Sequence, residues 1–585
     1  MEKVQTDIAI VGAGGAGLRA AIAIAEADPR VRISLISKVY PMRSHTCAAE
    51  GGAAGVIKPD DSLDLHFNDT VGGADWLCDQ DAVEYFINEA PKELLQLEHW
   101  GCPWSRMPDG SVNVRPFGGM KIKRTWFAAD KSGFHILHTL FQTSLKYPEI
   151  QRYDEFFCTD LLVEDGRCQG VVAMEMKSGR MLQFNAKAVI IASGGAGRVF
   201  PFTTNGAVKT GDGMALAYRA GVALKDAEFV QYHPTGLLST GILLTEGCRG
   251  EGGVLRNKDG YRYLQDYGMG PETPLGEPRL KTMELGPRDR LSQAFWQEQK
   301  KGNTIPTKWG DSVNLDMRHL GEKHIDERLP LVRDLSISYA GVDPVKEPVP
   351  VRPVVHYVMG GIHTDKEAAT SIPGLYAAGE CACVSINGAN RLGSNSLTEL
   401  LVFGKKAALN AIEYVSTGNK EVKDESVSPL ADAAQKRLGA IFESNGSESI
   451  SGLREEMMST MEEGVGIYRT EEGMQETCKR IDGLRKRFSN IALHDNSSVF
   501  NTNRLQALEL EAMLMVAQTM AEGALARKES RGAHQRLDFT ERNDADFLKH
   551  TLTYYQGEEK PRIDYLDVVI TKSQPGVRDY SGDEK

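Results

Sequence analysis

A histidine in a glycine-rich loop is the first residue of this chain whose surroundings suggest chemistry. His45 lies in "KVYPMRSHTCAAEGGAAG", between Ser44 and Thr46 and shortly before paired glycines. Such a histidine could transfer protons, bind a metal, form a bond to a cofactor or serve the structure alone. Taken by itself the structural role is favoured, so the elements around His45 must decide.

The N-terminal segment predicts a dinucleotide site. "TDIAIVGAGGAGLRAAIAIAEA" has the pattern of a buried strand, a glycine turn and an alanine-rich helix. The helix N-terminus would bind a pyrophosphate. The next strand, "VRISLISK", ends in Ser37 and Lys38 instead of the expected acidic residue, which weakens an NAD interpretation, although Ser37 could still bond a ribose. The glycines that match GxGxxG are Gly12, Gly14 and Gly17, with Gly15 in the same turn.

Two later segments favour FAD over NAD. "AKAVIIASGGAGRVF" predicts a strand that ends in a glycine turn near residue 194, and "IPGLYAAGECA" predicts another that ends at Gly379 and Glu380. NAD enzymes rarely need three strand-to-glycine junctions so far apart. An FAD domain does, because the returning chain contacts the flavin end of a long cofactor. The sequence therefore predicts an α/β, Rossmann-like FAD-binding domain.

Charge and cysteine content exclude several classes of protein. The net charge of -12 argues against a nucleic-acid partner, which usually meets a basic face. No apolar run approaches the roughly 18 residues of a membrane span, and no targeting signal opens the chain, so a cytoplasmic protein is expected. The nine cysteines form no CxxC pair. We therefore expect no metal site, and any iron–sulfur chemistry would belong to another chain.

Six motifs occur in the order seen in one flavoprotein family. They are "SHTCAAEGG", "HPTG", "TEGCRGEGG", "GPRD", "HYVMGGI" and "RLGSNSL". From about residue 5 to residue 572 the chain resembles the fumarate reductase/succinate dehydrogenase flavoprotein family, especially its bacterial quinol:fumarate reductase branch. This resemblance implies FAD bonded covalently, through its 8α-methyl, to the ring of His45. Such a bond withdraws electron density and raises the flavin's reduction potential.

The resemblance implies further contacts to FAD. For Asp212, in "TGDGMALAYRAG", capping of the following helix is an equally good interpretation. The residues implied, besides His45 and the N-terminal glycines with Ser37 and Lys38, are Ser44, Thr46, Glu50, Gly51, Gly52, Asp212, Glu380, Arg391, Ser396 and Leu397.

The resemblance also implies a small dicarboxylate substrate, fumarate or succinate, held by converging donors. Arg391 would grip one carboxylate, and Thr245 would donate a further hydrogen bond. His233, also counted as catalytic, and His356 would complete the set. Without the resemblance, each histidine would be interpreted as an ordinary loop residue.

Arg288, in "LGPRDR", is the proton donor that the resemblance implies. Glu246 and Arg249, three residues apart in "TEGCRG", would return the proton if the glutamate lies close to both guanidiniums. This strains the rule that arginine stays protonated. The alternative for "GPRDR" is an ion pair at a helix start between Asp289 and a neighbouring arginine.

Glu50 favours fumarate reduction, because the reductase branch generally has glutamate there and succinate dehydrogenases generally have glutamine. Succinate dehydrogenase remains the main alternative. L-aspartate oxidase shares several motifs but lacks the "RSHT" context of a covalent histidine. An inactive flavin carrier that only positions a partner is disfavoured by the complete set of candidate catalytic residues.

The motif order implies a discontinuous architecture with an α+β capping domain and a C-terminal helical domain. Thr245, Glu246 and Arg288 on the capping domain would lie over the flavin. The predicted segments are an FAD-binding domain at 1–237 and 354–418, the capping domain at 238–353, the helical domain at 419–542 and a C-terminal domain at 543–585.

Partners are implied by the resemblance as well. The basic run "RKESRGAHQRLDF" is typical of subunits that dock an iron–sulfur partner, although a solvated surface is the alternative. An iron–sulfur subunit, membrane anchor subunits and a flavinylation assembly factor are expected. The chain would lie peripherally at the cytoplasmic face of the bacterial inner membrane and pass electrons from quinol to fumarate in anaerobic respiration.

Overall fold

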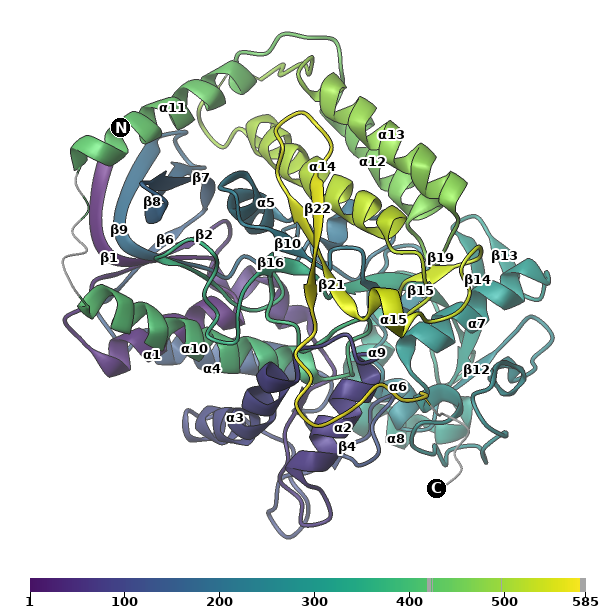
Figure 1. The fold of residues 1–585 in the computed structure, drawn as a ribbon. Helices are drawn as coiled ribbons and strands as arrows, with labels where there is room; N and C mark the ends of the chain where they lie inside the picture. Colours follow the sequence, from purple (N-terminus) through teal and green to yellow (C-terminus); the bar gives the residue numbers. More distant parts are fainter. Residues whose placement is uncertain (418–421, 423, 496, 579–585) are drawn as a thin grey trace.

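A twisted sheet lies at the centre of the nucleotide-binding part of the molecule. The computed structural model describes residues 1–417, 422, 424–495 and 497–578. Within these residues, seven strands join in the order β6-β2-β1-β9-β8-β7, with β17 also pairing with β9 (Figure 1). The strands are β1 (Glu2–Val11), β2 (Ile33–Ser37), β6 (Ile150–Asp154), β7 (Phe156–Glu164), β8 (Arg167–Glu175), β9 (Met181–Ile191) and β17 (Leu375–Ala377).

Strands β1, β9 and β17 are parallel neighbours although they are far apart in the sequence. Ile10 of β1 and Tyr376 of β17 both pair with Ile190 of β9. The carboxyl ends of parallel neighbours meet at one edge of a sheet, where open α/β sheets bind their ligands. The three predicted strand-to-glycine junctions therefore converge, and the predicted Rossmann-like fold is confirmed.

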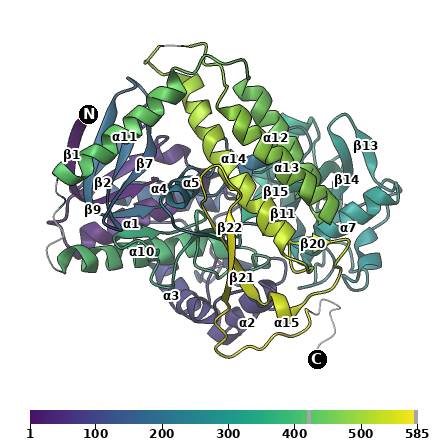
Figure 2. The same cartoon turned by 45° about the horizontal axis from the view of Figure 1, so that its top comes forward.

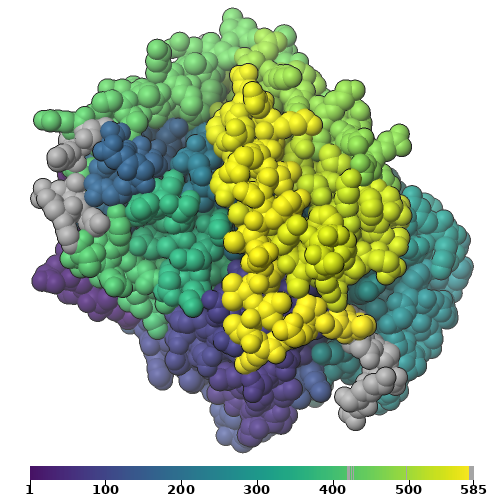
Figure 3. All heavy atoms as spheres, viewed as in Figure 1, coloured from purple at the N-terminus to yellow at the C-terminus, as the bar shows by residue number. Residues whose placement is uncertain are grey.

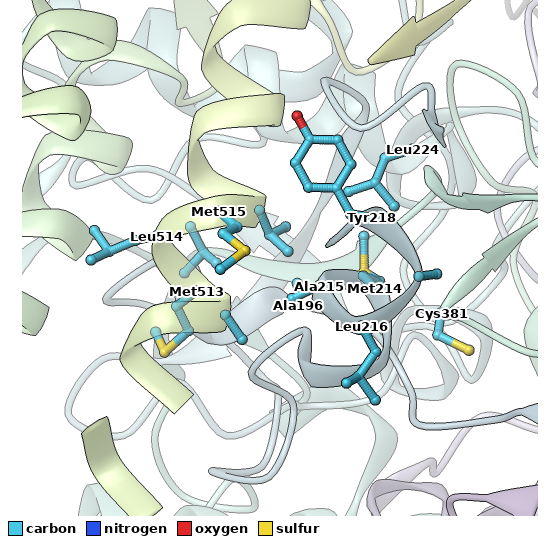
Figure 4. Packing of buried hydrophobic residues seen from close by; sticks show 14 of the residues in the cluster. Ala196, Met214, Ala215, Leu216, Tyr218, Leu224, Cys381, Met513, Leu514 and Met515 are labelled. Carbon is cyan, nitrogen blue, oxygen red and sulfur yellow. The ribbon is translucent and has the colours of Figure 1, made fainter. Parts of the chain in front are cut away.

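Each face of this sheet has its own hydrophobic core, because alternate residues of a strand point to opposite faces. Ile8 and Ile10 pack with α1 (Gly15–Ala27), α4 (Ser132–Ser144) and α10 (Asn395–Ser416). Ala9 and Val11 belong to the other core, which is completed by α5 and α14. Figure 4 shows side chains of these two helices in that core. Their bounds are Asp212–Arg219 for α5 and Thr502–Ala526 for α14.

The segment between β2 and β6 positions the His45 loop. After two short 3-10 turns, η1 (Pro41–Arg43) and η2 (His45–Ala48), the chain enters a small antiparallel sheet of order β3-β5-β4. Pairing of Ala53 with Trp126 holds the end of the loop in place. The remaining elements are β3 (Ala53–Ala54), β4 (Val114–Arg115), β5 (Thr125–Trp126), α2 (Leu63–Gly73) and α3 (Gln80–His99).

The predicted capping region has an antiparallel sheet of order β11-β15-β14-β12, with β13 pairing β14, and a hydrophobic core of its own. Strand β15 runs through the predicted boundary at 353/354 and pairs with β11, so one continuous sheet joins the two parts. The strands are β11 (Val230–Leu237), β12 (Val254–Arg256), β13 (Ile305–Thr307), β14 (Gly310–Asp316) and β15 (Val349–Val358), and the helices are α6 (Gly247–Gly250), α7 (Arg288–Lys300), α8 (Glu322–Arg328) and α9 (Pro330–Leu335).

Amphipathic helices follow, as the periodicity predicts. Figures 1 and 2 show α12 (Ile450–Gly464), α13 (Glu471–Phe488) and α14 side by side, and α11 (Asp424–Phe442) packs on β7. Val516 of α14 is fully buried, and the helix inserts between this bundle and the central sheet. The polar link predicted after residue 418 lies mostly outside the described residues.

The C-terminal residues add strands to a further sheet of order β18-β16-β10-β21-β22. Figure 3 shows this C-terminal segment as a continuous strip across one face of the molecule. The elements are β10 (Leu224–Lys225), β16 (Gly361–His363), β18 (Ala382–Cys383), α15 (Asp544–Phe547), β21 (Lys549–Tyr554) and β22 (Arg562–Asp567), with β19 (Tyr468–Arg469) and β20 (Gln535–Arg536) paired separately.

The arginines of the basic run before these strands are buried, so their side chains do not form a solvated surface. Arg527, Arg531 and Arg536 are at most 1% exposed. Arg527 pairs with Glu228 at 2.8 Å, and Arg531 pairs with Glu529 at 2.8 Å. The sequence could not reveal this burial, because a buried arginine needs a carboxylate partner. For Arg527 that partner is Glu228, which lies almost 300 residues away in the sequence.

Among the described residues, no helix combines the length and the apolar character that crossing a lipid bilayer requires.

Candidate active site

A cavity of about 190 Å³ opens where the carboxyl ends of β1, β9 and β17 meet. Gly17 lies behind this wall, in the first turns of α1. The predicted cofactor residues that line the cavity are Gly12, Gly14, Gly15, Ser37, Lys38, Ser44, His45, Thr46, Asp212, Glu380, Ser396 and Leu397.

Two glycines after β1 are required by close backbone contacts. Gly12 has a φ of +108°, and a Cβ there would lie 2.3 Å from the carbonyl oxygen of Ala192, just after β9. A Cβ at Gly17 would lie 1.8 Å from the carbonyl oxygen of Gly12. The turn is closed against β9, and the N-terminus of α1 is left facing the cavity.

The His45 loop lies beside this helix N-terminus. The Gly15 amide donates to Thr46 Oγ1 at 3.2 Å. Ser44 Oγ is buried near Gly14 and has no hydrogen-bond partner among the described residues. A buried hydroxyl beside the unpaired N–H groups of a helix start suits a phosphate oxygen. The residues present therefore fit the pyrophosphate of FAD.

His45 projects into the same cavity with one ring nitrogen already bonded. The Gly206 amide donates to Nδ1 at 3.2 Å. Burial and the positive charge of Lys209 hold the pKa of His45 well below its ordinary value, so the imidazole is neutral. A neutral ring whose Nδ1 accepts carries its proton on Nε2. Nε2 is then the ring nitrogen available for a bond to a cofactor.

Asp212 begins α5 but does not cap it, so the capping interpretation is wrong. Gly211 is the N-cap residue, and no side chain caps the helix. Asp212 accepts from Lys38 Nζ at 2.6 Å, and Lys38 also reaches Glu509 of α14 at 2.9 Å. Burial opposes the charge of Lys38, but the two carboxylates raise its pKa. This cluster joins the end of β2 to two helices at the cavity wall.

Glu380 has a partner that the sequence interpretation missed. The buried ammonium of Lys209 donates to its carboxylate, and the Val358 amide donates to the other carboxylate oxygen at 3.2 Å. Burial lowers the pKa of Lys209, although Glu380 opposes this. Lys209 lies in "TNGAVKTGDG", where no local signal distinguishes it from an exposed lysine.

A second, smaller cavity adjoins the first and shares His356, Ser396 and Leu397 with it. Arg249 lies just outside this cavity, behind Glu246. The predicted residues that line it are Glu50, Gly51, Gly52, His233, Thr245, Glu246, Arg288, His356, Arg391, Ser396 and Leu397. The structure thus brings the predicted substrate ligands and the proton donor to one place, from both sides of the predicted domain boundaries.

Glu246 lies between the two arginines of the predicted proton relay. Its Oε2 accepts from Arg288 Nε at 2.7 Å and lies 3.7 Å from Arg249 Nη2. Its other oxygen accepts from the Gly118 amide. Burial alone would raise the pKa of Glu246, but the two guanidiniums hold it below its ordinary value, so the carboxylate is charged. Glu246 therefore lies close to both guanidiniums, as the predicted relay requires.

Asp289 does not pair with a neighbouring arginine, so that alternative for "GPRDR" is wrong. Its carboxylate accepts from Arg578, near the C-terminus, at 2.7 Å. Arg288 is therefore left to face Glu246 and the cavity.

The two histidines lie against each other, with ring centroids 5.1 Å apart. His356 Nδ1 bonds Thr204 Oγ1 at 2.8 Å, and His233 Nδ1 accepts from the Thr235 amide at 3.3 Å. His233 Nε2 has no hydrogen-bond partner in the described part of the chain. Burial, followed by nearby arginines, holds both pKa values well below normal. Both rings are neutral, and His233, whose Nδ1 accepts, carries its proton on Nε2.

Glu50 borders this cavity as a neutral acid. Burial, and then the charge of Asp130, raise its pKa well above the ordinary value. The Thr245 amide donates to Glu50 Oε2 at 3.1 Å. Arg115 holds the residue that follows Glu50 by donating to the Gly51 carbonyl oxygen at 3.0 Å. Glu50 thus positions the backbone of Thr245 without adding charge beside a site for anions.

Arg391 approaches the cavity from the last part of the loop between β18 and α10. Its Nη1 donates to Ser396 Oγ at 2.9 Å, and its guanidinium carbon lies 4.4 Å from the ring centroid of Tyr357. Its Nη2 donates to Gln231, which sequence reasoning missed. A signal existed: Gln231 stands two residues before His233 in "QYHPTG", on the same strand.

Known proteins match this chain over nearly its whole length. A model described as "FAD binding domain" matches residues 7–397, and one described as "Fumarate reductase flavoprotein C-term" matches residues 454–580. The fumarate reductase flavoprotein subunit of Haemophilus influenzae is 61% identical over 100% of this chain and 97% of its own length. The succinate dehydrogenase flavoprotein subunit of Rickettsia conorii is 41% identical over 97% and 95%.

A solved structure agrees with these relatives. That of a variant of the flavoprotein subunit of Escherichia coli quinol fumarate reductase has a TM-score of 0.98 at 59% identity, with 100% of both chains covered. The chain belongs to the fumarate reductase/succinate dehydrogenase flavoprotein family.

Proposed function

We propose that this chain is the FAD-bearing catalytic subunit of a membrane-associated quinol:fumarate reductase, which reduces fumarate to succinate in anaerobic respiration. The observation that carries the proposal is that two cavities adjoin and share lining residues. One fits FAD, and the other gathers Arg288, Arg391, His233 and His356 directly beside it. A dianion held there would lie against the cofactor.

FAD would be held covalently, as an 8α-histidyl bond through Nε2 of His45. The Gly206 N–H to Nδ1 hydrogen bond supports this, because it is kept when the other ring nitrogen is alkylated. Bound FAD would supply the hydride for the reduction. Gly12, Gly14, Gly15 and Ser44 would hold its pyrophosphate. The remaining contacts are assigned to Gly17, Ser37, Lys38, Thr46, Gly51, Gly52, Asp212, Glu380, Arg391, Ser396 and Leu397.

Fumarate would be bound by one permanent cation and neutral donors. Arg391 would grip one carboxylate in bidentate fashion, while Thr245, His233 and His356 donate to the dianion. Because both histidines are neutral, they orient the substrate without binding it as tightly as further cations would. Holding a carboxylate out of the plane of the double bond would leave the alkene electron-poor and ready to accept hydride.

Arg288 would donate the matching proton to the second alkene carbon. As Arg288 loses that proton, the Glu246 carboxylate would take one from Arg249 and pass it to Arg288 across their 2.7 Å contact. Each transfer moves one proton one position inward, so the relay ends in its starting state once Arg249 is reprotonated from solvent. A charged Glu246 also lowers the cost of burying two guanidiniums.

The partners would be an iron–sulfur subunit and membrane anchor subunits, with an assembly factor for FAD attachment. The absence of any CxxC pair in this sequence supports an iron–sulfur cluster on another chain. The chain would then lie peripherally on the cytoplasmic face of the inner membrane. The proposal includes the predicted division into domains. These are an FAD-binding domain at 1–237 and 354–418, a capping domain at 238–353, a helical domain at 419–542 and a C-terminal domain at 543–585.

Succinate oxidation is the second candidate, since the same residues would catalyse it in reverse. The identities of 61% to a fumarate reductase subunit and 41% to a succinate dehydrogenase subunit favour fumarate reduction. Glu50 favours it too. The L-aspartate oxidase alternative is weakened by the fit of His45 to a covalent bond.

The test is flavin fluorescence on a denaturing gel, where the chain runs at 64.2 kDa, beside a His45→Ser variant. Fluorescence in the wild type and none in the variant is expected. A dark wild-type band from the assembled complex would overturn the covalent bond. In the same preparations, fumarate-dependent oxidation of reduced benzyl viologen measures the activity, and its absence in a flavin-loaded wild-type complex would overturn the function itself.

A further inference from the structure

Gln231 lies between the two arginines that the proposed function assigns to the substrate. It is a fully buried residue of β11, at 0% exposure. Its Oε1 accepts from Arg288 Nη1 at 3.0 Å and from Arg391 Nη2 at 3.2 Å. One amide oxygen has two lone pairs, so both are used, one by each guanidinium.

The other end of the amide is equally occupied. Gln231 Nε2 donates to the Arg391 carbonyl oxygen at 2.7 Å and to Asn390 Oδ1 at 2.9 Å. A backbone carbonyl can only accept, so the nitrogen must point toward it and the oxygen toward the arginines. The amide therefore has one orientation, set by the loop that carries Arg391.

A neutral acceptor suits this place for an electrostatic reason. Two buried guanidiniums repel each other: burial, and then the charge of Arg288, lower the pKa of Arg391 to about 10. A carboxylate between them would relieve the repulsion, but it would also cancel the positive charge that attracts a dianion. An amide oxygen holds both cations in place and leaves their charge intact.

We propose that Gln231 is the positioning residue that sets the spacing between Arg391, which binds one end of the substrate, and Arg288, which protonates the other. This inference rests on the proposed function. It assigns Gln231 no contact with the substrate: it acts through the two arginines.

Two substitutions separate geometry from charge. Gln231→Met keeps the length but removes the acceptor, so both guanidiniums can shift. We expect kcat to fall about 100-fold, as for a displacement of a catalytic group by about 1 Å, with little change in KM. Gln231→Glu keeps the shape and adds a negative charge. We expect it to raise the KM for fumarate and the Kd of malonate, measured from the flavin absorbance, at least about tenfold, since one good charge–charge contact is worth that much.

Gln518 provides the matched control. It is a buried glutamine of α14 whose Oε1 also accepts from an arginine, Arg485, at 2.6 Å, and it lies in neither cavity. Gln518→Met and Gln518→Glu should leave kcat and the KM for fumarate within about twofold of wild type. All variants are assayed as the assembled complex with reduced benzyl viologen, at equal covalent flavin content.

The results separate this inference from the proposed function. If the wild-type complex reduces fumarate and Gln231→Met does so at the same kcat, the positioning role is wrong and the function stands. If Gln231→Met fails to assemble, Gln231→Asn, which keeps the amide but withdraws it by one methylene, is expected to show the same loss of kcat. Wild-type kcat in that variant would overturn the inference. Equal effects of Gln231→Met and Gln231→Glu on the Kd of malonate would also overturn it, because a purely structural role predicts no dependence on charge.

Discussion

Arg578 and Asp289 form a buried ion pair between the C-terminal segment and the helix that begins with Arg288. The two nitrogens of Arg578 lie 2.7 and 3.2 Å from the two carboxylate oxygens, and the side chains are only 5% and 1% exposed. Earlier in the same segment, the Ser573 carbonyl oxygen accepts from Gln80 of α3 at 2.6 Å. The C-terminal segment therefore ties α7 to the helices beside the FAD-binding sheet.

Removing this tie should destabilise the protein. In Arg578→Met the Asp289 carboxylate stays buried without its bidentate partner, and breaking such a pair costs about 3 kcal/mol or more. We expect a lower free energy of unfolding in urea and faster proteolysis. The control is Arg562→Met, whose partner Asp564 is 55% exposed, so that the loss should be much smaller. Equal losses of unfolding free energy in the two variants would show that the buried ion pair stabilises the protein no more than the exposed one does.

Glu50 should make the protein less stable at high pH. Burial and Asp130 raise the pKa of this acid in the folded chain, so folding takes up a proton once the unfolded side chain has ionised. Stability should therefore fall as the pH rises above about 4.5, the ordinary value. Glu50→Gln mimics the protonated acid and should lose this part of the pH dependence. Melting temperatures measured from pH 5 to 9 check it, with Glu251→Gln as the control, because Glu251 is compensated by Arg328.

The sequence was most informative where a motif acts through its own backbone. The turns after β1, β9 and β17 could be predicted because glycine is needed wherever the chain closes tightly, and their convergence follows from parallel pairing. His45, Thr245, Glu246, Arg288 and Arg391 could be assigned because the motifs around them are long. Their arrangement around two adjoining cavities agrees with that prediction.

What could not be predicted depends on partners distant in the sequence. Lys209, Gln231 and Arg578 look like ordinary polar residues until the fold places Glu380, two arginines or Asp289 beside them. The same limitation applies to the arginines of the basic run. An arginine such as Arg527 is interpreted as exposed by default, and only the fold supplies the buried Glu228.

His550 should make stability depend on pH in the neutral to alkaline range. Burial would lower its pKa, but Asp226 at 2.6 Å and Asp79 at 3.1 Å raise it to about 9. Lys225 also faces this cluster, 3.5 Å from Asp79. Because the folded pKa exceeds the unfolded value of 6.5, the stabilisation is complete below pH 6.5 and is lost as the pH rises through about 9.

The size of this effect follows from the shift, which corresponds to about 3 kcal/mol. His550→Gln should therefore be less stable than wild type at pH 6, and the difference should shrink toward pH 10. Urea unfolding at a series of pH values measures it. His324→Gln is the control, since His324 pairs with Glu251 while 41% exposed, and its effect should be small at every pH. A difference between wild type and His550→Gln that does not change with pH would contradict this assignment.

Glu246→Gln tests the relay most directly. The substitution keeps the length of the side chain but removes the charge that Arg288 and Arg249 share, and an amide cannot return a proton to Arg288. We expect kcat for fumarate to fall by about 10²- to 10⁴-fold, as for loss of a general acid or base, with a much smaller change in KM. Malonate binding should persist, because Arg391 and the histidines are untouched. Glu251→Gln, five residues on and paired with Arg328 outside both cavities, should keep the wild-type kcat. If Glu246→Gln retained more than about a tenth of the wild-type kcat, Glu246 would be a structural partner of the arginines and the proton would reach Arg288 by another route.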